Sequence, residues 1–158
     1  MKAWFLIVFV VACGFSSCKK ESGISPPDET PNTWQYKGVT QKAAYSDIIA
    51  KSGFTLVFHP EPASGLANSL SFIFRSRPAS DQLYNASKDT SQANAVMIHL
   101  ETENIGDYNS IGNDTGAVRV FIKNGKLKLL AYDIRMLRDS TTGAATDSLK
   151  LSFNLLEF

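Results

Sequence analysis

The two histidines, His59 and His99, have the widest chemical repertoire of any side chains in this sequence. Each is followed two residues later by a glutamate, Glu61 or Glu101, and imidazole and carboxylate groups both ligate zinc. A structural zinc site needs four ligands, and the sequence has no closely spaced pair of strong ligands such as His-x-Glu-x-x-His. We therefore expect no metal and no cofactor, with both histidines on outward strand faces.

Carboxylates and serines are the residues that would carry out hydrolysis. Glycoside cleavage needs a pair of carboxyl groups, for which Glu101, Glu103, Asp107 and Asp133 are candidates. No spacing singles out two of them, and a solvated strand edge accounts for all four. A serine hydrolase holds its nucleophile in a tight Gly-x-Ser-x-Gly turn, and the residues around Ser64 lack that pattern. We expect no enzyme, and a hydrolase is only the last alternative.

The loop over residues 107–114 is rich in oxygen-bearing side chains, which calcium prefers. Ile111 stands where the helix-loop-helix calcium pattern has an oxygen donor. Asn, Asp and Gly are also the residues that turns select for backbone freedom. A plain turn is therefore the interpretation we adopt for this loop.

Four aromatic residues flank the expected loops and strand edges: Trp34, Tyr36, Tyr84 and Tyr108. Aromatic rings at the rim of a β-sandwich can stack on a sugar, as they do in many carbohydrate-binding modules. The alternative is that these rings close the ends of the core and leave only their polar tips in water. Both interpretations stay open from the sequence.

The first 17 residues have the organisation of a secretory signal. Lys2 precedes an apolar run over residues 3–12, which is about half the 20 residues that a membrane-spanning helix needs. The segment after this run ends in Phe-Ser-Ser-Cys18, which resembles the lipobox of bacterial lipoproteins because small residues precede the cysteine. Cys13 follows a similar Val-Val-Ala and is the alternative acceptor. Cys18 is preferred because cleavage before Cys13 would leave an odd thiol in an oxidising compartment.

Residues 18–32 contain three prolines and mixed charges without an apolar pattern, so we expect a lipidated N-terminus followed by a flexible tether. Two or more acyl chains, such as palmitate, hold a protein stably on a bilayer. Position 19 is Lys and not Asp, which by resemblance to Gram-negative lipoproteins argues against retention in the inner membrane. The expected location is the cell envelope, at the outer membrane, with the leaflet left open.

Residues 33–158 read as one β-rich domain. Apolar residues alternate with mostly polar ones in five segments, which is typical of half-buried antiparallel strands. These segments are 54–59, 70–75, 96–101, 118–123 and 149–155. The expected fold class is all-β and mainly antiparallel, a β-sandwich or small barrel of seven or eight strands.

Asn124-Gly125 predicts a type I′ turn, and therefore a hairpin that joins residues 117–123 to 126–137. Within the second arm, Leu127 and Leu129 share one parity while Tyr132, Ile134 and Met136 share the other. To point both sets inward, the strand needs a β-bulge near residues 130–131. This interpretation places Tyr132 in the core.

Residues 41–51 are ambiguous: Ala44, Tyr45, Ile48 and Ile49 fit one face of a short helix, whereas the alternate residues Gln41, Ala43 and Tyr45 fit a strand. The segments 60–68, 76–93, 103–116 and 139–147 are expected to be loops, since they are rich in Pro, Gly, Ser, Asn, Asp and Thr.

The charge balance bears on the partner class. The chain carries 16 basic and 15 acidic residues, a net charge of +1, and no basic cluster of the kind that nucleic-acid binding needs. We therefore expect no nucleic-acid partner.

The whole pattern resembles the small surface lipoproteins of Gram-negative bacteria. The resemblance rests on Ser-Ser-Cys18-Lys-Lys, on Trp34-Gln-Tyr36, on Asn124-Gly-Lys-Leu followed by Asp133, and on the terminal run that begins at Ser148. Because that family has no agreed activity, only the role of Cys18 carries over. The leading hypothesis is a non-enzymatic, lipid-anchored domain that binds a glycan or a partner protein. The alternative is an accessory subunit of an envelope complex, held by its edge strands.

Overall fold

The computed structural model describes residues 32–50, 53–60, 68–103, 105–111, 116–139 and 147–158, and these residues form ten strands without a helix. None of them therefore belongs to a helix capable of crossing a bilayer. Cys13, Cys18, Glu61, Ser64 and most of the tether lie outside the described residues. The strands are β1 (Thr33–Tyr36), β2 (Val39–Ile49), β3 (Phe54–Pro60), β4 (Asn68–Phe74), β5 (Gln82–Ala86), β6 (Ala95–Thr102), β7 (Tyr108–Ser110), β8 (Ala117–Lys123), β9 (Lys126–Arg138) and β10 (Ser148–Leu156).

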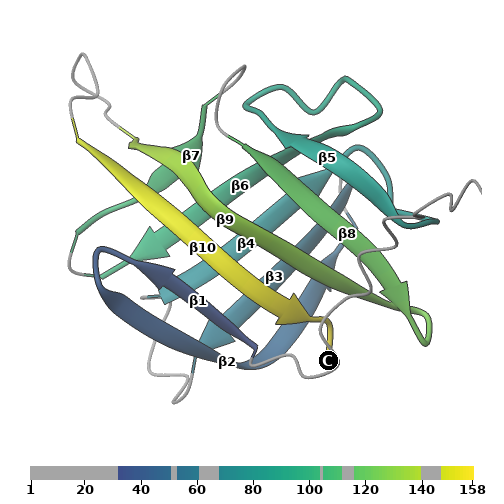
Figure 1. Ribbon diagram of the computed structural model, residues 1–158, viewed down its shortest axis with the longest axis horizontal. Helices are drawn as coiled ribbons and strands as arrows, with labels where there is room; N and C mark the ends of the chain where they lie inside the picture. Colours follow the sequence, from purple (N-terminus) through teal and green to yellow (C-terminus); the bar gives the residue numbers. More distant parts are fainter. Residues whose placement is uncertain (1–31, 51–52, 61–67, 104, 112–115, 140–146) are drawn as a thin grey trace, which may run out of the picture.

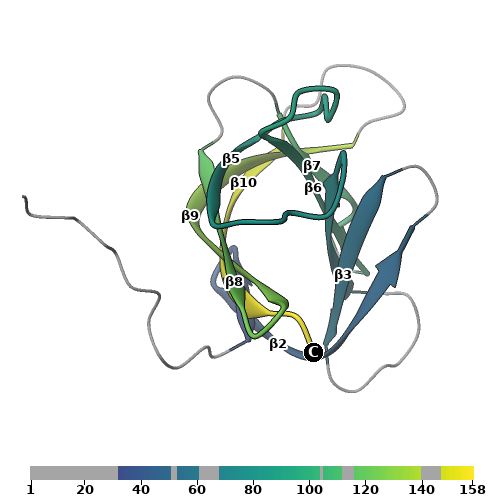
Figure 2. The same ribbon diagram turned by 90° about the vertical axis from the view of Figure 1, so that its right-hand side faces the viewer.

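Nine of these strands close into a barrel in the order β10-β1-β2-β3-β4-β6-β5-β8-β9, and pairing of β9 with β10 completes the ring. Neighbouring strands are antiparallel except β5 and β6, which run parallel over two residue pairs. The tenth strand, β7, lies between β6 and β9 and pairs with both. Figures 1 and 2 show β8, β9 and β10 on one side of the barrel and β3, β4 and β6 on the other. The expected all-β class is confirmed, in its barrel form.

The interior of the barrel is filled by large apolar side chains. A closed sheet of eight or nine strands is just wide enough for side chains from opposite walls to meet. Phe72 on β4 and Phe153 on β10 do so, with ring centroids 4.9 Å apart in an edge-to-face arrangement. Phe74 on β4 and Tyr84 on β5, two strands away along the sheet, form another edge-to-face pair at 5.0 Å. Such pairs add about 0.5–1.5 kcal/mol each to the free energy gained from burial.

The hairpin predicted from Asn124-Gly125 is confirmed. Both residues have positive φ, 53° and 78°, as a type I′ turn requires, and they join β8 to β9. A second turn of the same kind, Lys37-Gly38, joins β1 to β2 with φ of 43° and 78°. The five strands expected from alternation are all present, as β3, β4, β6, β8 and β10.

The predicted bulge in β9 is present slightly further along. Between the pairs Ile134–Leu151 and Ala131–Phe153, β9 advances three residues while β10 advances two. Asp133 absorbs the difference with φ of 55°, and its N–H donates to Ser152 Oγ at 3.0 Å. The prediction that Tyr132 faces the core is wrong: its side chain is 71% exposed. The alternation of inward and outward side chains along β9 shifts by one residue after Tyr132 and not before it, so this residue points outward.

The structure settles one question that the sequence left open and corrects two expectations. Residues 41–49 are strand, because β2 pairs with β1 and β3, with a bulge between Ala43 and Tyr45. Two short strands, β5 and β7, lie in segments expected to be loops, 76–93 and 103–116. The count therefore rises above the expected seven or eight strands.

Candidate functional site

The four aromatic residues considered for ligand stacking point into the barrel. Trp34, Tyr36, Tyr84 and Tyr108 are each 6% exposed or less and belong to the core cluster. They occupy inward positions of β1, β5 and β7, where the pleat directs alternate side chains inside. Their rings are therefore not presented to an external ligand.

The histidines sit on outer strand faces and have local partners. His59 on β3 stacks on Tyr45, with ring centroids 4.6 Å apart, and its Nε2 lies 3.3 Å from Asp47 Oδ2. His99 on β6 shares a 2.8 Å hydrogen bond between its Nδ1 and Asn109 Oδ1. Among the described residues, no group of three or more His, Cys, Asp or Glu side chains could hold a metal ion.

The carboxylates considered for hydrolysis are placed on different elements. Glu101 near the end of β6 accepts a 3.3 Å hydrogen bond from Ser69 Oγ. Glu103 and Asp107 lie in the connection to β7, and the Asp107 carbonyl oxygen accepts a hydrogen bond from the Asp139 N–H at 2.7 Å. Asp133 occupies the bulge of β9, with Lys150 Nζ 3.9 Å away.

The oxygen-rich loop at 107–114 begins as strand β7 instead of as an open calcium loop. Ser110 Oγ is buried, where it accepts a hydrogen bond from the Ile98 N–H at 3.0 Å and donates one to the Ser87 carbonyl at 3.1 Å. Asn109 is engaged with His99 and donates to Asp139 Oδ2 at 3.2 Å. The side chains of Asn109 and Ser110 are therefore engaged in hydrogen bonds within the barrel. Residues 112–114 fall outside the described part of the chain.

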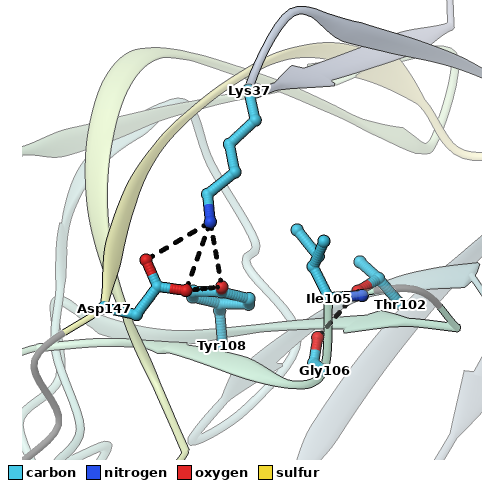
Figure 3. Close-up of polar contacts among 6 residues, drawn as sticks. All are labelled: Lys37, Thr102, Ile105, Gly106, Tyr108 and Asp147. Carbon is cyan, nitrogen blue, oxygen red and sulfur yellow. Dashed lines mark hydrogen bonds and ion pairs between the residues drawn. The ribbon is translucent and has the colours of Figure 1, made fainter.

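Lys37, Tyr108 and Asp147 form a polar network at one end of the barrel (Figure 3). Tyr108 donates its hydroxyl proton to Asp147 Oδ2 at 2.5 Å, and Lys37 Nζ donates to the Tyr108 hydroxyl oxygen at 3.2 Å. Lys37 Nζ also reaches both carboxylate oxygens of Asp147, at 3.3 and 3.2 Å. The network ties the β1–β2 turn to β7 and to the residue that precedes β10.

The hydrogen bonds of this network, together with burial of Tyr108, shift the pKa values of its three groups. The hydrogen bond from Tyr108 and then that from Lys37 lower the pKa of the Asp147 carboxyl. Burial raises the pKa of Tyr108, and hydrogen bonding with Tyr108 and Asp147 raises that of Lys37. Each group is thereby held further in its ordinary charge state at neutral pH, whereas an acid–base catalyst needs a pKa moved toward neutrality. The nearby turn, in which Thr102 Oγ1 donates to the Gly106 carbonyl at 2.8 Å, supports β7 (Figure 3).

An open hollow of about 160 Å³ lies on the outer wall, across β9, β10, β1 and β2. The register of the strands explains how it forms, because paired residues share a face. One row runs from Thr40 through Gln35 to Ser152, and the next joins Thr33 to Asn154. The full lining is Thr33, Gln35, Thr40, Tyr132, Ser152, Phe153 and Asn154. We call this feature the outer-wall groove.

The lining of the outer-wall groove combines neutral polar groups with one exposed aromatic ring, that of Tyr132, since the Phe153 ring packs against Phe72 inside the barrel. Three hydroxyls and two carboxamides line it, and none of the lining residues carries a charge. Tyr132 is the most exposed large apolar residue of the described chain. Asn154 Oδ1 is buried and has no hydrogen-bond partner among the described residues. An unpaired buried carbonyl oxygen is costly, so a side-chain rotation that turned it toward a donor of a bound ligand would be favoured.

Sequence reasoning missed this site. The signal that could have found Tyr132 was the parity conflict within residues 127–136, because the side chain at a bulge can be turned to the opposite face. Nothing in the sequence marks Gln35, Ser152 or Asn154, whose roles depend on neighbours more than 100 residues away. Comparison with known proteins adds no precedent: no family model, no curated protein and no solved structure matches this chain.

Proposed function

We propose that this protein is a lipid-anchored domain of the bacterial cell envelope that binds a ligand in its outer-wall groove without chemical conversion. The observation that supports ligand binding is the groove itself, which joins an exposed aromatic ring to uncharged hydrogen-bonding groups. This composition is typical of sites that recognise neutral, hydroxyl-rich or amide-rich ligands. A glycan or an uncharged stretch of a partner protein satisfies it.

The anchor rests on Cys18. The thioether-linked lipid would bring the N-terminus to a membrane and leave the barrel outside it, at the end of the polar tether. With Cys18→Ser we expect the protein to leave the membrane fraction, whereas Cys13→Ser, the matched control, should leave membrane association unchanged. Mass spectrometry of the mature N-terminus then identifies the acylated residue. If both variants sediment with membranes as the parent does, the anchor proposal fails.

Binding at the groove is tested by photo-crosslinking on intact cells. A photoreactive amino acid in place of Gln35, at the centre of the groove, should give a specific adduct with an envelope component. The same replacement at Leu83, which is 54% exposed on β5, serves as the control. Equal labelling from both positions, or none from either, would contradict the groove as a binding site.

A second candidate function, subunit of an envelope complex, is favoured by the edge of β2. β1 covers only Val39–Lys42, so among the described strands Tyr45–Ile49 pairs with β3 alone. Ile48 and Ile49 there are 51% and 43% exposed, and an uncovered apolar edge invites pairing with another chain. Ile49→Lys should then abolish co-purification of an envelope partner, while Leu83→Lys should not. If Ile49→Lys has no effect, this candidate is excluded.

A further inference from the structure

We infer that the outer-wall groove binds one pyranose ring of a neutral glycan, with Tyr132 as the stacking platform and the Asn154 carboxamide as the acceptor of a sugar hydroxyl. The inference rests on the proposed function, because it names the ligand class of the same groove.

The size of the groove points to a single ring. Its volume of about 160 Å³ is smaller than the roughly 300–1,000 Å³ of clefts that enclose drug-sized ligands. One exposed aromatic ring, Tyr132, borders it, and one tyrosine ring covers about the area of one pyranose face. The groove is open, so a longer glycan can extend from the bound ring over the neighbouring strands.

The uncharged lining of the groove favours a neutral ligand. No lysine or arginine lines it, and Lys42, the cross-strand partner of Thr33 on β2, lies beside the lining and not in it. A phosphate or carboxylate would therefore find no cationic group among the lining residues. A neutral sugar needs none, because its hydroxyls can exchange water for the hydroxyl and carboxamide groups of the lining.

The geometry of the wall gives the two key residues complementary roles. Tyr132 projects from the bulge of β9, and the apolar C–H face of a pyranose can lie on its ring. Asn154 stands two residues beyond Ser152 on β10, paired with Thr33 on the adjoining strand. The outer torsion of an asparagine side chain is soft. A small rotation therefore lets the unpaired Oδ1 of Asn154 accept a hydroxyl proton from a ligand in the groove.

Four more hydrogen-bonding side chains line the groove around this pair, those of Thr33, Gln35, Thr40 and Ser152. Gln35 presents both a donor and an acceptor, and Thr33 and Thr40 present hydroxyls of either role. Neighbouring hydroxyls of a sugar also act as donor and acceptor in turn, so such a set can satisfy several of them at once. A peptide backbone offers fewer such groups and no flat apolar face of matching size.

The test measures binding of the purified full-length protein in detergent micelles. The probes are an array of neutral oligosaccharides and, in solution, methyl pyranosides of the common neutral hexoses and of N-acetylhexosamines. We expect binding that Tyr132→Ala weakens at least tenfold and that Tyr132→Phe changes less than about threefold, because the ring face remains. Tyr45→Ala, a matched loss of an exposed tyrosine on β2, should have no effect.

A second variant, Asn154→Leu, tests the proposed hydrogen bond to the sugar, and its melting temperature shows whether the barrel is still folded. It should weaken binding at least tenfold without lowering the melting temperature, because the oxygen it removes has no partner in the described chain. If no sugar probe binds while the photoreactive residue in place of Gln35 still crosslinks to an envelope protein, the sugar inference is wrong and the proposed function stands. Silence in both assays would overturn both. Sugar binding that survives Tyr132→Ala and Asn154→Leu would overturn the assignment of the groove.

Discussion

Removing Arg77 should loosen the C-terminal end of the barrel by a calculable amount. The Arg77 guanidinium donates from Nη1 and Nη2 to the Glu157 carboxylate at 3.1 and 2.8 Å, in a two-point contact. The same carboxylate accepts a hydrogen bond from the Leu127 N–H at 2.8 Å, and the Leu127 carbonyl oxygen accepts one from the Glu157 N–H at 2.9 Å. Arg77 also lies 5.0 Å from the centre of the Phe54 ring. One arginine thus holds the end of the chain to the β8–β9 hairpin.

The magnitude follows from the unequal burial of the two partners. The Glu157 side chain is 8% exposed and that of Arg77 is 38% exposed. Breaking a fully buried ion pair by removing one partner costs about 3–5 kcal/mol. Because water can enter where Arg77 was, we expect Arg77→Met to lower the free energy of unfolding by about 2 kcal/mol. At about 3–5 °C per kcal/mol for a domain of this size, the melting temperature should fall by about 6–10 °C.

Urea unfolding followed by circular dichroism measures this loss, and two further variants make it specific. Adding Glu157→Gln to Arg77→Met should recover about half of it, since the amide is neutral yet still accepts the Leu127 N–H. Arg75→Met removes one hydrogen bond, to the exposed Ser91 carbonyl, and should cost less than about 0.5 kcal/mol. The reasoning is refuted if Arg77→Met unfolds like the parent, or if the double variant is less stable than Arg77→Met alone.

Two further predictions concern a pair of glycines and the response to acid. Gly53 has φ of 127° and a Cβ there would lie 2.7 Å from a backbone oxygen of β4, so Gly53→Ala should cost at least about 3 kcal/mol in urea unfolding. Gly125→Ala, at φ of 78° in open space, should cost only about 1 kcal/mol, and equal costs would contradict the clash. The pKa of Asp147 is lowered by its hydrogen bond from Tyr108, so this stabilisation is present above the unfolded value of 3.8 and is lost as pH falls through the folded-state pKa. The free energy of unfolding, measured from pH 6 to 2.5, should therefore fall less steeply in Tyr108→Phe than in the parent. Parallel curves for the two proteins would contradict this role of the Tyr108–Asp147 hydrogen bond.

The features that sequence reasoning predicted correctly are local ones. Alternation of Phe54, Leu56 and Phe58 against polar neighbours is set by the two-residue repeat of a strand, and Asn124-Gly125 carries its own backbone preference. The missed strands lack such a signal. β7 has only three residues and persists because β6 and β9 flank it, and β5 lies in a polar segment held by β8.

The candidate site was beyond prediction for a related reason. Periodicity indicates which face of a strand a residue occupies but not which strand lies beside it. Gln35 and Ser152 become neighbours only because β1 pairs with β10, and Tyr132 joins them only because the bulge turns it outward. The buried aromatic residues Trp34 and Tyr108 attracted attention by type alone, whereas their inward positions assign them to packing.

The place of β10 between β1 and β9 fixes the order of events during synthesis. Trp34 on β1 pairs with Phe153 on β10, so the ring cannot close until β10 has been synthesised. Until then a nascent chain carries two uncovered sheet borders, and contacts between such distant partners form slowly. A premature stop that deletes β10 would leave those borders permanently open, and the product should aggregate instead of persisting as a smaller soluble domain.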